Sequence, residues 1–243
     1  MTYCIGLRLN KGLVFMADTR TSAGVDNFAT SKKMFTWHTP GERTITIMTA
    51  GNLATTQAVI SLLEERSKTL EERDPSILRE KTMFQVARLV GATLREVIDE
   101  TTNEGQLKQD QFSASLIVGG QIEGGKPTIF LIYPQGNFIE ITQDTPFFQI
   151  GETKYGKPIL VRTYDPEMSF EDALTLLLVS FDSTVKSNLS VGLPFDFQVY
   201  EADSFTEGTS SRITDSDAVY LAISEGWGDA LKSAFQQLPT YKL

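Results

Sequence analysis

The spacing of apolar residues changes repeatedly along this chain, and these changes constrain the fold more than any other feature. Apolar residues that alternate with polar ones, as in half-buried strands, recur over residues 3–51 and again over residues 112–150. Apolar residues at helical spacing follow each of these stretches. Two strand-rich segments, each followed by helices, predict two antiparallel sheets stacked face to face and covered by helices on both outer sides. The expected fold class is therefore α+β, a four-layer αββα sandwich.

The same patterns place the individual elements. Strands are expected where short apolar runs alternate between turn residues: 3–9, 13–17, 33–37, 43–50, 112–118, 128–133, 138–141, 147–150 and 196–202. Helices are expected where apolar residues recur every three or four positions: from 53 through a charged run to 74, from 75 to about 101, then 153–164, 169–188 and 215–238. Gly119-Gly120 is expected to be a turn. No polar linker divides the chain, so one domain over residues 1–243 is expected.

Composition excludes several classes of function. A net charge of −9 argues against a protein that binds the phosphate backbone of nucleic acids. No apolar run reaches the roughly 18–20 residues that span a bilayer, and no secretory signal opens the chain. A single cysteine, Cys4, excludes an internal disulfide and fits a reducing cytoplasm, while its apolar neighbours suggest a small buried side chain. With His38 the lone histidine, no metal site and no cofactor are expected.

The first 20 residues are expected to form a β-hairpin. A three-residue loop that places Leu9 opposite Leu13 would also place Cys4 opposite Asp18. Because residues two apart share a face, this register predicts that Thr2, Cys4 and Asp18 lie on one face. Diagonal neighbours such as Thr2 and Asp18 would then lie about 7–8 Å apart, within reach of one bridging side chain.

Thr2 becomes a candidate nucleophile if Met1 is removed, because the residue then carries a hydroxyl and a free α-amine. An amine with a pKa of about 7.7–8.0 can act as a base near neutral pH. Lys33, expected to share a face with Phe35 on the third strand, would stabilise the developing negative charge, and Asp18 would hold its ammonium group. The backbone N–H of Gly51, between a strand and a helix, is a suitable oxyanion donor.

Two further hydroxyl residues are candidates for oxyanion or substrate binding. Ser22 lies in the polar stretch that follows Asp18, and Thr49 lies two residues before Gly51. Each charged or glycine candidate also has a structural explanation. Asp18 could cap a turn, Lys33 could extend from a sheet edge into solvent, and Gly51 could end a strand.

Four segments together resemble the N-terminal half of proteasome β-subunits and of the HslV protease, which are N-terminal-nucleophile hydrolases. The matching segments are Thr2, Gly12–Arg20, Ser31–Phe35 and Met48–Gly51. The Met-Thr-Tyr-Cys start is similar to that of Anbu, a bacterial branch of this family also called the ancestral β-subunit.

This resemblance implies an N-terminal-nucleophile hydrolase fold and hydrolysis of peptide bonds inside a self-assembled homo-oligomer, either a ring or an open helical assembly. It implies that Thr2 is the nucleophile, that Asp18 and Lys33 form the adjacent charged pair, and that Gly51 supplies the oxyanion hole. It leaves open whether an ATP-driven unfoldase is a partner.

The second half departs from the family pattern near the terminal amine. Active proteasome β-subunits have a Gly-Ser-Gly turn and an Asp-Ser-x-Ser-Gly segment there. The corresponding stretches of this chain are Gly151-Glu152-Thr153 and Asn188–Gly192. Glu152 and Ser190 are therefore the candidates for holding the amine.

Three hypotheses follow. The first is a threonine-type hydrolase that cleaves peptide bonds. The second, motivated by the altered residues near the amine, is an amidase for a small or modified amide. The third is a self-assembling scaffold whose catalytic geometry is vestigial.

Overall fold

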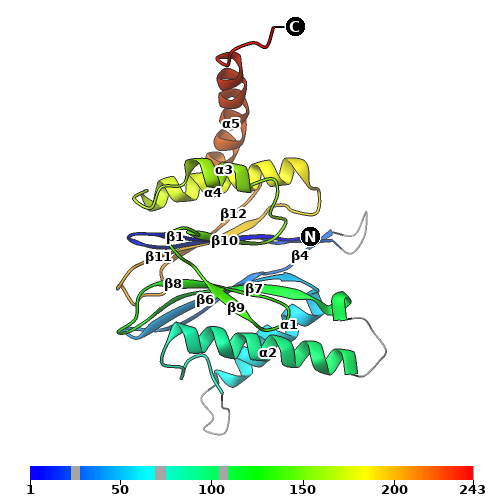
Figure 1. Ribbon diagram of the computed structural model, residues 1–243, viewed down its shortest axis with the longest axis vertical. Helices are drawn as coiled ribbons and strands as arrows, with labels where there is room; N and C mark the ends of the chain where they lie inside the picture. The colour runs from blue at the N-terminus through cyan, green and yellow to red at the C-terminus, as the bar shows by residue number, and fades with distance from the viewer. Residues whose placement is uncertain (23–27, 69–74, 104–108, 243) are drawn as a thin grey trace.

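Two five-stranded antiparallel sheets lie face to face between two layers of helices (Figure 1). The computed structural model describes residues 1–22, 28–68, 75–103 and 109–242. Apolar side chains fill each of the three spaces between the four layers. The expected αββα sandwich is confirmed.

The first sheet combines strands from the beginning and from the second half of the chain, because the N-terminal hairpin lies between later strands. Its order is β10 (Phe147–Gly151), β1 (Tyr3–Leu9), β2 (Gly12–Asp18), β11 (Phe195–Glu201) and β12 (Thr209–Ile213). The helices α3 (Lys157–Thr163) and α4 (Phe170–Ser187) cover it (Figure 1). Ser169 caps α4, since its hydroxyl accepts a hydrogen bond from Asp172 N.

The second sheet is built from the middle of the chain. Its order is β5 (Met34–Thr39), β6 (Arg43–Gly51), β7 (Ala114–Ile122), β8 (Thr128–Ile132) and β9 (Phe138–Glu140). The helices α1 (Leu53–Arg66) and α2 (Met83–Asn103) cover its outer face, and a short 3₁₀ helix (Gln109–Phe112) precedes β7. A small hairpin of β3 (Arg20–Ser22) and β4 (Phe28–Thr30) extends from β2.

The N-terminal hairpin is one residue out of the expected register. Leu9 pairs with Gly12, not with Leu13, so the turn between the strands has two residues. The reason is the neighbouring strand β11, which passes so close that a Cβ on Gly12 would lie 2.0 Å from the Tyr200 carbonyl oxygen. Gly12 is therefore part of the strand and does not belong to the turn.

This register overturns the predicted arrangement of Thr2, Cys4 and Asp18 on one face. With Cys4 opposite Ala17, Asp18 falls opposite Tyr3 at the end of the hairpin. The Asp18 carboxylate instead turns to the backbone, where Oδ1 accepts a hydrogen bond from Tyr3 N at 2.9 Å.

The predicted shared face of Lys33 and Phe35 is also wrong, because Lys33 lies before β5 begins. Phe35 and Trp37 pack toward the core beneath α1 and α2. Lys33 reaches across to the other sheet, where its ammonium group meets Asp18.

Several element boundaries differ from the sequence prediction. The helix α2 starts at Met83, eight residues after Pro75, and the strand β12 was not predicted. Gly119-Gly120 lies inside β7 and is not a turn. Glycine is needed at both positions because the Phe15 ring and the Thr44 backbone approach too closely for a side chain. The end of the predicted charged run, residues 69–74, lies outside the described residues.

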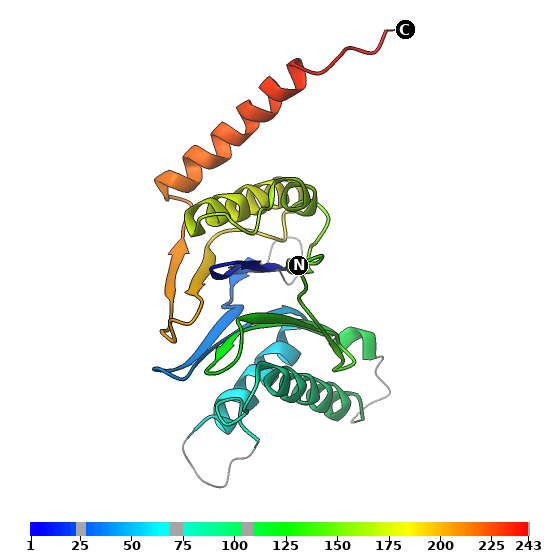
Figure 2. The ribbon, with the colours of Figure 1, turned by 60° about the vertical axis from the view of Figure 1, so that its left-hand side comes forward.

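The last helix, α5 (Ala218–Gln236), projects away from the four layers (Figure 2). Its expected apolar side is largely uncovered: Val219, Leu221, Leu231 and Phe235 are exposed, while Tyr220 is buried against α4. Nowhere in the described ranges is a helix both long and apolar enough to cross a membrane.

Candidate active site

A cavity of about 460 Å³ lies beside Thr2, at the edge of the two sheets. The chain terminus, the β3 strand and the end of β6 form its walls, which include Met1, Thr2, Thr21, Lys33, Thr49 and Gly51. Four of the residues predicted from the sequence therefore meet in one cavity, and Asp18 lies directly behind Lys33.

A buried ion pair forms the rear of this site. Lys33 Nζ lies 2.7 Å from Asp18 Oδ1 and donates a second hydrogen bond to the Arg20 carbonyl oxygen at 2.6 Å. Asp18 is fully buried, and backbone N–H groups satisfy it further, from Tyr3 to Oδ1 and from Gly192 to Oδ2 at 3.3 Å. This network fixes the Lys33 ammonium at the cavity wall.

The electrostatics of the cavity favour a neutral amine and a neutral thiol. Burial first, and then the Lys33 charge, lower the pKa of the Met1 α-amine, and Asp18 opposes this change. Burial raises the pKa of the Asp18 carboxyl, and Lys33 with the two backbone donors opposes that rise. Burial also raises the pKa of the Cys4 thiol, so Cys4 is not a thiolate nucleophile at neutral pH.

The Gly51 N–H is directed toward the cavity. Alternate N–H groups of a central strand face opposite neighbours. Thr49 N donates to Lys33 O, on the β5 side, whereas Asn52 N donates to Ser113 O, on the β7 side. The Gly51 N–H therefore faces the β5 side, beyond the last pair of that ladder, Met34 with Met48. Among the described residues no strand pairs with this N–H group, so it is a candidate oxyanion donor.

Gly151 is a site residue that the sequence prediction assigned only to a family segment. It pairs with Tyr3, has a φ of 82°, and lines the cavity. A Cβ at this position would lie 1.9 Å from the Thr2 carbonyl oxygen and 2.6 Å from its carbonyl carbon. Only glycine fits, and it brings the backbone after β10 directly against Thr2.

Glu152 and Asn188 lie on the amine side of Thr2. Glu152 N donates to the Thr2 carbonyl oxygen at 2.7 Å, and the Glu152 side chain is buried. Its carboxylate accepts hydrogen bonds from Lys154 N at 3.1 Å and from Asn188 Nδ2 at 3.0 Å. Asn188 Nδ2 also lies 3.9 Å from Met1 Sδ. The carboxylate is thus placed beside the chain terminus and has no ion pair within the described residues.

The other predicted residues have less direct positions. Ser190 donates its backbone N–H to Asn188 Oδ1 at 3.0 Å, so it supports Asn188. Ser22 ends β3, where it pairs with Phe28, and its side chain lies outside the described part of the chain. Its neighbour Thr21 was not predicted, yet it lines the cavity with a buried Oγ1 that has no hydrogen-bond partner among the described residues. Alternation along β3 is the signal that could have identified it.

Arg20 holds the loop that completes the Asp18 network. Its guanidinium donates to the Leu189 carbonyl oxygen at 3.0 Å, and it packs against Gly192 so closely that a Cβ there would lie 2.2 Å from Arg20 Cζ. This contact keeps the Gly192 N–H in position to donate to Asp18.

The arrangement is suited to acyl transfer. Thr2, the Lys33–Asp18 pair and the Gly51 backbone border one cavity. A hydroxyl, a buried ammonium and a free N–H are the kinds of group with which acyl-transfer enzymes activate a nucleophile and stabilise an oxyanion. In the ranges that the structure covers, no group of three or more His, Cys, Asp or Glu side chains is arranged to hold a metal ion.

Known proteins are similar to this chain in sequence and in fold. The pattern of the proteasome subunit family matches residues 2–196. Anbu (ancestral beta-subunit) from Yersinia bercovieri is 46% identical, with a TM-score of 0.91, and the alignment covers 99% of this chain and 100% of that one. A structure described as the helical assembly of the Anbu complex from Pseudomonas aeruginosa has the same identity and TM-score, with 99% and 98% covered. The proteasome subunit beta of Haloquadratum walsbyi is 27% identical over 194 residues, which are 79% of this chain and 70% of that protein.

The matched region contains the candidate nucleophile, the buried ion pair, the candidate oxyanion donor and the segment around Glu152. The likeness to the Anbu structures continues over nearly the whole chain, well beyond the family match. In sequence and in fold, the chain belongs to the proteasome subunit family.

Proposed function

We propose that this protein is a threonine-type N-terminal-nucleophile hydrolase that cleaves peptide or other amide bonds after removal of Met1. The observation that carries the proposal is the Lys33–Asp18 pair, held at 2.7 Å within the wall of the cavity that Thr2 also lines. A buried ammonium beside a hydroxyl has a chemical use in acyl transfer, whereas a scaffold alone gains little from burying two charges.

The proposed reaction begins with the trimmed chain, in which Thr2 carries the free α-amine. Thr2 Oγ attacks the substrate carbonyl carbon, and the amine accepts the hydroxyl proton. The Lys33 ammonium lowers the energy of the developing negative charge, and the Gly51 N–H donates to the oxyanion. When the tetrahedral intermediate collapses, the C–N bond breaks and the leaving amine takes the proton. Water then hydrolyses the Thr2 ester by the same steps.

Glu152 is the group that we assign to hold the Thr2 amine, with Asn188 positioning it. Its backbone N–H already binds the Thr2 carbonyl, and its buried carboxylate lies beside the terminus. A carboxylate stabilises an ammonium more strongly than a serine hydroxyl would. In this assignment the Glu152 carboxylate orients the amine for proton transfer.

Intact-mass measurement and substrate hydrolysis test this proposal together. We expect the purified native protein to have lost Met1, and a panel of peptide and small amide substrates to include one that is hydrolysed. Thr2→Ala should abolish that hydrolysis, whereas Thr2→Ser should retain part of it because serine keeps the hydroxyl and the amine. Native protein that retains Met1, or Thr2→Ala with full activity, would contradict the proposal.

We also propose that the chain assembles with copies of itself through α5. The projecting helix exposes Leu231 by 50% and Phe235 by 75%, which is unusual for side chains of this size on a free surface. The related structure from Pseudomonas aeruginosa is described as a helical assembly.

A further inference from the structure

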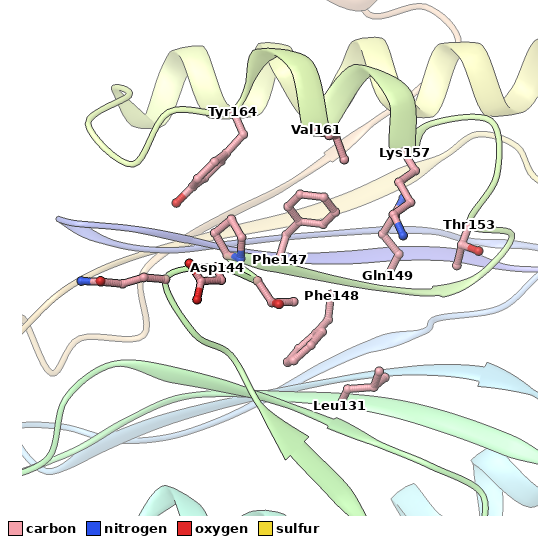
Figure 3. A pocket seen from close by; sticks show the side chains of 12 residues that line it. Leu131, Asp144, Phe147, Phe148, Gln149, Thr153, Lys157, Val161 and Tyr164 are labelled. Atoms are coloured by element: carbon pink, nitrogen blue, oxygen red, sulfur yellow. The ribbon is translucent and has the colours of Figure 1, made fainter.

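A second cavity, of about 660 Å³, lies along the free edge of the first sheet (Figure 3). The strand β10 forms its back wall. Lys157, Val161 and Tyr164 border it from the α3 side, and Leu131 of β8 borders it from the other sheet. The cavity is thus a groove between a helix and a sheet, with a strand along its length.

The backbone of β10 is unpaired on the side of this groove. Arg8 N donates to Pro146 O at 2.9 Å, and Glu152 N donates to Thr2 O at 2.7 Å. Because hydrogen-bonding direction alternates along a strand, even-numbered residues of β10 bond to β1. The N–H and C=O groups of Phe147 and Gln149 therefore point the other way. The sheet order ends with β10, so no strand covers these groups in the described residues.

The side chains of the groove are placed to contact an extended chain, whose own side chains point alternately to its two sides. Phe147 points toward α3 and Phe148 toward the second sheet (Figure 3), so apolar surface lies on both sides of the free edge. Asp144 lies near one end of the groove and Lys157 near the other. Neither forms an ion pair with a side chain in the described ranges. A ligand with a cation at one end and an anion at the other would complement them.

We propose that this groove binds an extended segment of the substrate polypeptide as an additional strand on β10. The inference rests on the proposed function, because it assigns the groove to the same substrate. Unpaired N–H and C=O groups of an edge strand recognise another backbone, whatever its sequence.

The position of the groove favours the substrate polypeptide, and not a second copy of this chain, as the occupant of the groove. The strand β10 ends at Gly151, which lines the Thr2 cavity and lies against the Thr2 backbone. A peptide paired with Phe147 and Gln149 therefore continues directly toward the nucleophile. The substrate class is an unfolded polypeptide, long enough to occupy both cavities.

Two substitutions at Gln149 separate the contribution of its backbone N–H to binding from that of its side chain. Gln149→Pro removes an N–H that faces the groove and leaves the bonds to β1 intact, since that N–H is not part of their ladder. Gln149→Ala retains the N–H, and both variants lose the side-chain hydrogen bond to the Tyr3 hydroxyl at 2.6 Å. Both are made in a Thr2→Ala background, so that binding is measured without hydrolysis and independently of the proposed chemistry.

The probe is fluorescein-labelled, reduced and carboxymethylated α-lactalbumin, and binding is followed by fluorescence anisotropy. We expect Gln149→Pro to raise the Kd at least tenfold relative to Gln149→Ala. Equal affinities would overturn the proposal. A smaller assembly for Gln149→Pro than for Gln149→Ala in light scattering would also overturn it, because a second copy would then occupy the edge.

Hydrogen exchange provides a test without substitution at the edge. In the Thr2→Ala protein, saturating probe should slow amide exchange in fragments covering residues 147–151. Unchanged exchange there would overturn the proposal even if Gln149→Pro failed to fold. Failure of the proposed function is distinguishable, since it would appear as absent hydrolysis by the wild-type protein with binding at β10 intact.

Discussion

Replacing Lys33 by methionine tests whether the buried ion pair is coupled as the structure indicates. Methionine has a similar length but no charge, so it leaves Asp18 buried with only the N–H groups of Tyr3 and Gly192 as partners. The Lys33 side chain is 5% exposed and the Asp18 side chain 0%, so water cannot replace the lost ammonium group. Removing one partner of a buried pair costs about 3–5 kcal/mol.

For a chain of this size, each kcal/mol lowers Tm by about 2–4 °C. We therefore expect Lys33→Met to lower the midpoint of thermal unfolding by about 6–20 °C. Asp18→Asn should also destabilise, because it leaves Lys33 without a counter-ion. The double variant should be more stable than the sum of the two single effects predicts, since neither charge remains.

The assay is thermal unfolding of the wild type, both single variants and the double variant at one protein concentration, since assembly makes Tm depend on concentration. A loss below about 1 kcal/mol for Lys33→Met would place the pair among solvent-screened ion pairs. Strict additivity in the double variant would refute the coupling on which the site geometry depends.

Three other outcomes are expected. Gly151→Ala should lower Tm and abolish hydrolysis, because the new Cβ would meet the Thr2 backbone at 1.9 Å; Gly226→Ala, where a Cβ meets nothing within 4 Å, is the control and should leave both unchanged or raise Tm slightly. Hydrolysis should increase with pH as the Thr2 amine loses its proton. Burial and the Lys33 charge lower the pKa of the Met1 amine, and we expect the same causes to act on the Thr2 amine one residue along, which places the midpoint below the usual value of about 7.7–8.0; a midpoint above 8 would argue against the amine as base. Phe235→Ser should reduce the assembly mass in light scattering without loss of helical signal, whereas Lys232→Ser, on an exposed polar position of α5, should not; equal masses for the two variants would exclude this face of α5 from the interface.

The layer order could be predicted from the sequence because strand and helix periods are local. The family resemblance led us to expect Thr2, Lys33 and Gly51 near one another, and they line one cavity, whereas the strand faces predicted for Asp18 and Lys33 are wrong. The hairpin register could not be predicted from the sequence, because it depends on β11, which lies nearly 190 residues from Gly12 along the chain and pairs with it in the sheet.

The same limit explains what was missed around the site. Thr21 lines the cavity and was not predicted, because the course of the chain after Asp18 is set by the β3–β4 hairpin. The apolar pattern of α5 predicted a helix with an apolar side, and on that side Leu231 and Phe235 are uncovered. Periodicity shows that a face is apolar, but not which chain covers it.

Covalent labelling of Thr2 is the most direct test of the central claim. A peptide epoxyketone forms its cyclic adduct only where a hydroxyl and a free α-amine lie on the same residue, so the reaction reports both processing and nucleophilicity. We predict one adduct per chain by intact mass, located at Thr2 by fragmentation and absent from Thr2→Ala. A wild-type protein that has lost Met1 and still remains unlabelled at saturating reagent would contradict the account.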